Sequence, residues 1–283
     1  MREARRRRIA YLLLVPGVLF LTVFFLIPMF TMLSTSFMEG TPERGFDFTG
    51  HWQNYIESFS DYDTQIYRSL VYGLIVTVVT LALSFPLAYW IAFRGGRRKN
   101  LYLLLLLLPF FTPFVIRTLA WKQILADNGV FLGALKDWGV LSDDFQLLAT
   151  PTAVLGGLIY NFLPFMALPL YVALERLDPR LLDAASDLYS DRRQTFFKVT
   201  LPLAMPGIFA GSLLTFIPAV GDFINSELLG SVRTTMIGQV IQRHFLTTLD
   251  FPAGAALSFL LMAGILVGVF LYARALGTEE LTG

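Results

Sequence analysis

Cysteine is absent from the 283-residue sequence, and histidine occurs only at His51 and His244. Disulfides, thiolate metal sites and a cysteine nucleophile are therefore excluded, while the redox compartment stays open. The two histidines are far apart and have no metal-ligand spacing around them, so we expect surface or hydrogen-bonded roles for both. Only 15% of the residues are charged and 55% are hydrophobic, whereas soluble domains are about a quarter charged. This composition indicates a membrane protein.

A phosphate-binding loop is also missing, because the dipeptide Gly-Lys that ends such loops occurs nowhere in the sequence. Any ATP used by this system would have to be hydrolysed on another polypeptide, so we expect the chain itself to bind no cofactor. The sequence offers no convergent set of His, Asp and Ser residues for a membrane enzyme. We therefore expect no catalytic residues, no metal site and no nucleic-acid partner.

Long apolar segments are what the chain has instead. A bilayer-spanning helix needs about 20 apolar residues, and six segments approach or exceed that length. They cover approximately residues 9–33, 69–93, 101–122, 150–174, 199–225 and 252–273. The first follows an arginine-rich start and is too long for the core of a signal peptide, so we expect it to be retained. The predicted fold class is an all-α polytopic membrane protein with about six transmembrane helices in one domain, residues 1–283.

Basic residues are concentrated in alternate connectors. Residues 1–8, 94–99 and 175–198, together with the end of the chain from Arg274, hold about two thirds of all Arg and Lys residues, whereas residues 38–68 and 127–144 are rich in acids. Cytoplasmic connectors of membrane proteins carry the excess of Lys and Arg. The pattern predicts cytoplasmic termini and a cytoplasmic loop 175–198 in a bacterial inner (plasma) membrane.

Prolines are frequent inside the apolar segments, which predicts kinked helices around a cavity, because membrane helices tolerate proline where neighbours satisfy the freed carbonyls. Two glycine pairs at four-residue spacing, Gly207 with Gly211 and Gly264 with Gly268, would allow helices to approach closely.

The loop 175–198 has signals for two short helices. Asp178 followed by a proline predicts a helix start that continues to about Tyr189. Asp191 with Gln194 three residues later predicts the start of a second helix. The alternative is an ordinary solvated connector that happens to contain two adjacent alanines.

This loop resembles the cytoplasmic signature of ABC-importer permeases, in which an acid, two alanines, a glycine four residues later and a closing Leu-Pro mark the segment that docks onto the ATPase. Here Tyr189 replaces the glycine, which would have allowed a left-handed turn at low cost. The resemblance implies a type I ABC-importer permease fold with a cytoplasmic coupling-helix loop. The coupling residues that it implies are Asp183, Ala184, Ala185, Asp187, Leu188, Tyr189, Arg192, Leu201 and Pro202.

The fifth apolar segment ends with polar residues. Asp222 and Asn225 are three apart and would share a helix face, with Glu227 further toward the outside. An acid at membrane depth costs a few kcal/mol and normally faces a cavity or a partner charge. These residues are either a cation-attracting lining of a transport path, or a hydrated helix end in which Asp222 pairs with a base such as Arg117 or Lys122.

The same segment, with Phe-Ile-Pro at 216–218, Leu-Leu-Gly at 228–230 and residues 251–256, resembles the permeases of spermidine/putrescine ABC importers. A polyamine is a polycation, so its route would need acids and aromatic faces. The candidate path residues are Asp222, Phe223, Asn225, Glu227, Trp121, Tyr160 and Asn161. Trp121, Tyr160 and Phe223 would supply the aromatic faces and Asn161 a polar contact, although residues of these types more often serve in packing or in an interfacial belt.

The resemblance implies a second homologous permease, two ATP-binding subunits carrying ATP and Mg, an extracytoplasmic solute-binding protein and a small cationic substrate. Transport would proceed by alternating access in the lipid bilayer. Two alternatives remain: an ABC importer for another small solute, such as an organophosphonate, a metal ion or an inorganic anion, or a secondary transporter. Lining by Arg117 and Lys122 would favour an anion.

Overall fold

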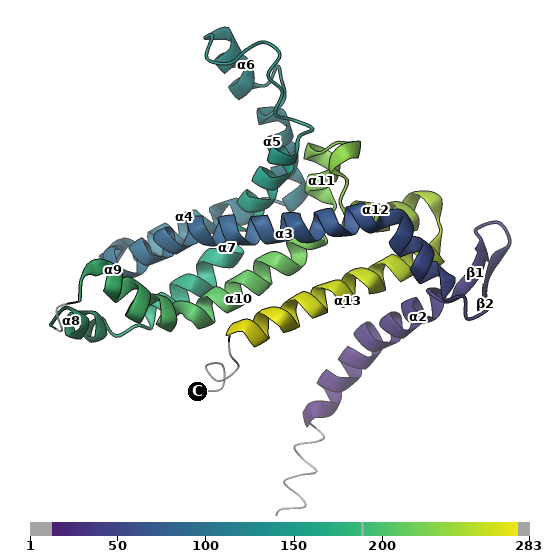
Figure 1. The fold of residues 1–283 in the computed structure, drawn as a ribbon, viewed down its shortest axis with the longest axis horizontal. Coiled ribbons are helices and arrows are strands. Elements are labelled where there is room, and N and C mark those ends of the chain that lie inside the picture. Colours follow the sequence, from purple (N-terminus) through teal and green to yellow (C-terminus); the bar gives the residue numbers. More distant parts are fainter. Residues whose placement is uncertain (1–12, 188–189, 277–283) are drawn as a thin grey trace, which may run out of the picture. The chain divides into compact units, whose positions relative to one another are not determined.

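The computed structural model describes residues 13–187 and 190–276, without the side chains of residues 130, 179, 183, 186, 275 and 276. Figure 1 labels its main elements. In chain order they are a helix over residues 13–21, α2 (Ile27–Thr35), β1 (Met38–Thr41), β2 (Gly45–Phe48), α3 (Gln53–Arg94), α4 (Lys99–Leu107), α5 (Phe114–Ile124), α6 (Val130–Asp137), α7 (Pro151–Glu175), α8 (Pro179–Asp187), α9 (Arg192–Thr195), α10 (Leu201–Val220), α11 (Ile224–Leu229), α12 (Ile237–Arg243) and α13 (Phe251–Leu276). Short 3-10 turns cover Gly96–Arg98, Leu108–Phe111 and Val232–Thr234, and π-helical turns cover Thr22–Leu26, Phe196–Thr200 and His244–Thr248.

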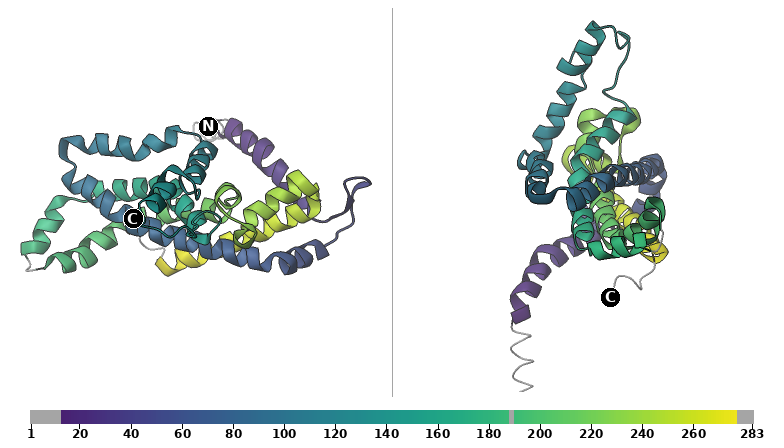
Figure 2. Two further views of the ribbon diagram at one scale, coloured as in Figure 1. Left: turned by 90° about the horizontal axis from the view of Figure 1, so that it is seen from above. Right: turned by 90° about the vertical axis from the view of Figure 1, so that its left-hand side faces the viewer.

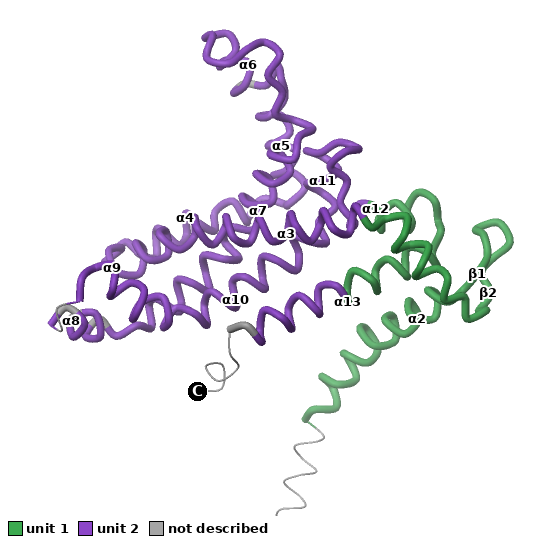
Figure 3. Tube along the Cα trace, viewed as in Figure 1, with its two compact units in different colours: residues 1–63, 240–263 green, residues 64–239, 264–283 purple. Residues whose placement is uncertain are grey.

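The described residues form two compact units (Figure 3). Unit 1 contains the residues up to Asp63 together with Val240–Ala263, and unit 2 contains Thr64–Gln239 with the residues from Gly264 onward. By length and composition, five described helices could cross a membrane, or six if one bent pair counts as a single span.

Three helices differ in extent from the segments expected from the sequence. Helix α3 begins at Gln53, well before residue 69, and its backbone is non-helical at Tyr62, so a polar first part precedes the apolar one. The third segment is divided by an 89° bend between Phe111 and Phe114, because Pro113 disfavours helical geometry in the residue before it. Helix α10 ends at Val220, so Asn225 lies on the separate helix α11.

Unit 1 consists of the first apolar helix, a β-hairpin, the first part of α3 and the start of α13. Strands β1 and β2 pair antiparallel, with Met38 opposite Phe48 and Thr41 opposite Gly45. The Asn54 side chain donates hydrogen bonds to the carbonyl oxygens of Ser36 (3.0 Å) and Met38 (2.9 Å), which fixes the hairpin to α3.

Helices α7 and α10 form the centre of unit 2. Thr150 caps α7 by accepting a hydrogen bond from the Ala153 amide (3.3 Å), and Pro151 occupies the first turn. One buried cluster joins the two helices through Met166, Leu170, Ala204 and Ile208. The views of Figures 1 and 2 agree that the loop with α8 and α9 lies at one end of this pair and α11 at the other. These helices therefore connect the two ends of unit 2.

Close approach of α7 and α10 depends on one of the two glycine pairs. A Cβ atom at Gly207 would lie 2.5 Å from the Ala173 Cβ and 2.7 Å from the Pro169 carbonyl oxygen, and one at Gly211 would lie 2.8 Å from the Met166 sulfur. The expectation of close packing is thus confirmed for this pair. At Gly264 a Cβ would meet no described atom within 4 Å, so that glycine is not required for packing within the part of the chain that the structure describes.

We expect Gly207→Ala to destabilise the protein by about 1–3 kcal/mol, because overpacking forces the neighbouring backbone to move. Gly264→Ala is the matched control, and it should leave stability unchanged or slightly raised because alanine favours helix more than glycine does. The midpoint of thermal unfolding of the purified protein in detergent measures both. Equal midpoints for the two variants would contradict the close-approach argument.

Candidate functional site

The loop 175–198 contains both helices that the sequence predicts. The Asp178 carboxylate accepts a hydrogen bond from the Arg180 amide (3.0 Å), and Asp191 accepts one from the Gln194 amide (2.6 Å). Both predicted N-caps are therefore confirmed. Helix α8 ends at Asp187 in the described chain, while Leu188 and Tyr189 lie outside the described residues, as does the side chain of Asp183.

Helix α8 presents two different faces. Leu181 is 46% exposed and Ala184, three residues later, is also exposed. Ala185 lies on the other face with only 9% exposure, and its carbonyl oxygen accepts a hydrogen bond from the Ser190 amide (3.1 Å). The free apolar face therefore consists of Leu181 and Ala184, whereas Ala185 packs within the loop.

The remaining predicted coupling residues flank this helix. Asp187 and Arg192 are exposed, and Leu201 and Pro202 form the first turn of α10 after a π-helical turn. At the base of the loop, Lys99 forms an ion pair with Glu175, the last residue of α7. This contact holds the loop's first residues against the turn between α3 and α4.

A buried polar cluster lies at the other end of α7 and α10, and we define it as Thr118, Asn161, Asp222 and Asn225. Asn161 is fully buried, and its amide donates to the Asn225 Oδ1 (3.1 Å) and to the Thr118 Oγ1 (3.3 Å). Asn225 in turn donates its backbone amide to Asp222 Oδ1 (2.7 Å) and its side-chain amide to Asp222 Oδ2 (3.1 Å). The cluster thus ties α5, α7 and α11 together.

Asp222 is 8% exposed and occupies the turn between α10 and α11, so its side chain caps the short helix rather than sharing a helix face with Asn225. It forms no ion pair with any described residue, including Arg117 and Lys122. The Oδ1 atom of Asn161 is buried and has no hydrogen-bond partner within the described chain. The cluster therefore holds a carboxyl group without a paired base and an unused hydrogen-bond acceptor.

Arg117 is enclosed by aromatic rings. Its guanidinium lies 4.8 Å from the ring centre of Phe110, 5.5 Å from that of Phe114 and 6.0 Å from that of Tyr160, and the residue is 8% exposed. Such contacts stabilise a buried cation in place of an acid. Arg117 is therefore held within the protein and does not present its charge to a solute.

The other candidate path residues are more accessible. Phe223 is 38% exposed and Glu227 is exposed, and Gln239 donates a hydrogen bond to the Glu227 carboxylate. Trp121 and Tyr160 form an edge-to-face pair with ring centres 5.2 Å apart. The structure thus brings Asp222, Asn225 and Asn161 together, and leaves Glu227 on α11 and Phe223 immediately before α11 exposed at the surface.

Sequence reasoning missed the residues that support α11 from the following loop. The Ser226 hydroxyl donates to Gln239 Oε1 (2.9 Å) and accepts from the Met236 amide (3.1 Å). The Ser69 hydroxyl accepts from the Ile237 amide (2.8 Å). Isolated Ser and Gln residues carry no sequence signal for such contacts, because the partners come from distant parts of the chain.

Residues 84–275 match the family described as binding-protein-dependent transport system inner membrane component. The chain is 39% identical over 256 residues to the spermidine/putrescine transport system permease protein PotB of Haemophilus influenzae, covering 90% of each chain. It is 36% identical to PotB of Escherichia coli, covering 90% of this chain and 93% of that protein. A bacterial alginate ABC transporter, solved in complex with an alginate pentasaccharide-bound periplasmic protein, contains a chain with a TM-score of 0.73 and 21% identity, covering 99% of this chain and 97% of that one.

Proposed function

This chain belongs to the family of binding-protein-dependent transport system inner membrane components, and from that premise we propose that it is the permease of an importer for polyamines. It is a multi-pass transport subunit with the ABC-importer permease fold, not an enzyme. The observation that carries the substrate assignment is the 36–39% identity, over 90% of the chain, to two spermidine/putrescine permeases.

The proposed importer contains a second homologous permease, two ATP-binding subunits that carry ATP and Mg, and an extracytoplasmic solute-binding protein. The termini and the loop 175–198 face the cytoplasm in this arrangement, in line with the excess of Arg and Lys there. The exposed face of α8 supports the assignment of the loop as the ATPase contact. Movement of the loop would reach the polar cluster through α7 and α10, which join the two regions.

Asp222 supports a cationic substrate, because the cluster carries its charge without a paired base. Glu227 on α11 and Phe223 just before it would offer a carboxylate and an aromatic face to an ammonium group. An anionic substrate is less well supported, since Arg117 is enclosed by Phe110, Phe114 and Tyr160. Of the two bases that would favour an anion, only Lys122 is exposed.

The test is ATP hydrolysis by the complex in lipid with its solute-binding protein present. We expect spermidine or putrescine to raise the rate severalfold, and phosphate or an organophosphonate to leave it at its basal level. Stimulation by a different solute alone would overturn the polyamine assignment while leaving the importer in place. Failure of any ATPase to co-purify would contradict the coupling role of the loop.

A further inference from the structure

The two helices of the third apolar segment meet at a sharp bend. Helix α4 and the 3-10 turn after it end at Phe111, and α5 begins at Phe114 at an angle of 89° to them. Pro113 lies within the bend and has no amide hydrogen, so the carbonyl oxygen of Pro109, four residues earlier, lacks its helical donor. That oxygen accepts a hydrogen bond from the Thr112 amide (3.2 Å) and keeps a second lone pair for another donor. The bend therefore offers an acceptor to a side chain.

Arg117 lies one turn into α5 and reaches back across the bend. Its Nη1 donates a hydrogen bond to the Pro109 carbonyl oxygen (3.4 Å), and its guanidinium lies 4.8 Å from the ring centre of Phe110, before the bend. The same group lies 5.5 Å from the ring centre of Phe114, after the bend, and 6.0 Å from that of Tyr160 on α7. A single side chain thus contacts both arms of the bend and the neighbouring helix.

The charge of Arg117 is unusual at this place. The residue is 8% exposed, it pairs with no acid of the described chain, and its Nε has no hydrogen-bond partner there. A charged side chain within a membrane span is costly, and such residues are commonly functional. Methionine or leucine would fill the space between the rings without that cost. Packing alone therefore does not explain the guanidinium, whose planar, charged group can stack on several rings at once.

Thr118, the next residue, connects the bend to the polar cluster. Its hydroxyl donates to the Phe114 carbonyl oxygen (3.1 Å) and accepts from the Asn161 amide (3.3 Å). Asn161 also donates to Asn225 (3.1 Å), whose side-chain and backbone amides both donate to Asp222. A path of hydrogen bonds therefore leads from the first turn of α5 to the carboxyl group of the cluster.

We propose that Arg117 is a positioning residue for transport. Its contacts with the rings fix the angle of the bend, and the bend in turn holds Thr118, Asn161 and Asp222 in the arrangement that the substrate meets. Arg117 acts through these residues and does not touch the substrate itself. The inference rests on the proposed function, because it takes the polar cluster as part of the transport path.

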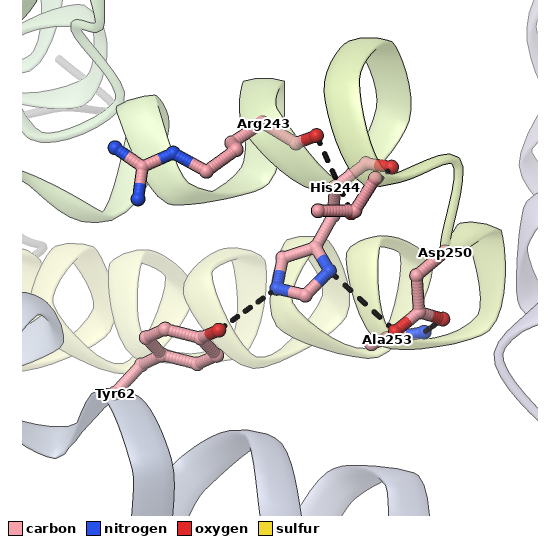
Figure 4. Close-up of polar contacts among 6 residues, drawn as sticks. Tyr62, Arg243, His244, Asp250 and Ala253 are labelled. Carbon is pink, nitrogen blue, oxygen red and sulfur yellow. Dashed lines mark hydrogen bonds and ion pairs between the residues drawn. The ribbon is translucent and has the colours of Figure 1, made fainter.

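A second irregular helix provides a matched control. Helix α3 is non-helical at Tyr62, whose hydroxyl lies 3.1 Å from His244 Nε2, and His244 Nδ1 lies 3.6 Å from Asp250 Oδ2 (Figure 4). Asp250 also accepts a hydrogen bond from the Ala253 amide (3.3 Å). All of these residues belong to unit 1, and none belongs to the polar cluster. Tyr62→Phe therefore removes a side-chain contact at a break in a helix without changing the cluster.

The first measurement reports the bend itself and needs no substrate. Because the sequence contains no cysteine, Leu101→Cys on α4 and Ile124→Cys at the end of α5 provide two unique sites for spin labels, and both side chains are exposed (50% and 39%). Arg117→Met should broaden the distribution of label-to-label distances about twofold in the purified complex, because the cation–π contacts across the bend are lost. Arg117→Lys keeps the cation but not the planar group, so its distribution should have an intermediate width. Tyr62→Phe should leave the width unchanged.

The second measurement is a double-mutant cycle in spermidine uptake by proteoliposomes that contain the complex and its solute-binding protein. Arg117→Met should lower uptake about tenfold, in line with the strength of desolvated cation–π contacts. Combined with Asp222→Asn it should add little to the loss that the latter causes alone, because positioning has no effect once the charge is removed. Tyr62→Phe should leave uptake unchanged. Thermal unfolding checks that each variant is folded, and Arg117→Lys carries both measurements if Arg117→Met does not fold.

Equal widths in Arg117→Met and its parent would overturn the role of Arg117 at the bend. Losses of uptake that multiply in the double variant would overturn the positioning role, because they would indicate an independent effect on stability. Full uptake in Asp222→Asn would overturn it as well, since the cluster would then hold no charge that acts on the substrate. The proposed function is read separately from ATP hydrolysis. If spermidine does not stimulate the wild-type complex while Arg117→Met still broadens the distances, the polyamine assignment alone is refuted.

Discussion

Ala184→Arg should reduce the transport rate about tenfold or more while the membrane spans stay assembled. Ala184 is exposed on α8 beside Leu181, so an arginine there adds bulk and charge to the face proposed to contact the ATPase. A loss of ~1.4 kcal/mol in docking free energy already weakens association tenfold. Uptake into proteoliposomes and ATP hydrolysis, measured on the same preparation, report the expected uncoupling.

Ser142→Arg is the matched control, since it adds an arginine at an exposed position of the connector between α6 and α7. It should leave transport unchanged. Normal transport in Ala184→Arg would refute the docking role of this face, and an equal loss in both variants would point to a general effect of added charge. Ala185→Arg is a less specific probe, because Ala185 is packed inside the loop and its replacement would also disturb the loop itself.

Local features of the fold were predictable because their causes lie within a few residues. The caps at Asp178 and Asp191 each depend on one side chain and an amide two or three residues later. The lengths of the apolar segments identified the membrane helices in the same way, because each length can be read from one continuous stretch of sequence. Proline content also predicted kinks, although it did not show that the main bend would fall between Phe111 and Phe114.

Contacts between distant segments were not predictable, because they depend on which helix faces meet. The bond from Asn161 to Asn225 joins residues 64 apart in the chain, and both residues were proposed for the path without any indication that they touch. Lining of the path by Arg117 was one alternative, which would have favoured an anionic solute, but rings from three positions enclose its guanidinium. Side-chain burial of this kind follows from tertiary packing rather than from sequence spacing.

Asp222→Asn should lower spermidine uptake about tenfold while most of the complex still assembles. The Asn225 amide donates to Asp222 Oδ1, and asparagine caps helices as well as aspartate does, so the turn into α11 is retained. The variant loses the charge and one acceptor for the Asn225 side chain. At an effective dielectric constant of about 20, a unit charge ~8 Å from a passing cation contributes ~2 kcal/mol, which exceeds the value needed for a tenfold effect.

Comparison of Asp222→Asn with Asp222→Ala separates the effect of the charge from the effect of the helix cap. The alanine variant loses both, so it should also destabilise the protein by about 1–3 kcal/mol, because the buried donors of Asn225 lose their acceptor. Asp144→Asn, at an exposed position before α7, carries the same chemical change as Asp222→Asn and should transport normally. If Asp222→Asn keeps full uptake while Asp222→Ala loses stability, then Asp222 acts only as a helix cap. If Asp222→Asn loses uptake at nearly unchanged stability, its charge acts on the substrate, and the polar cluster is part of the transport path.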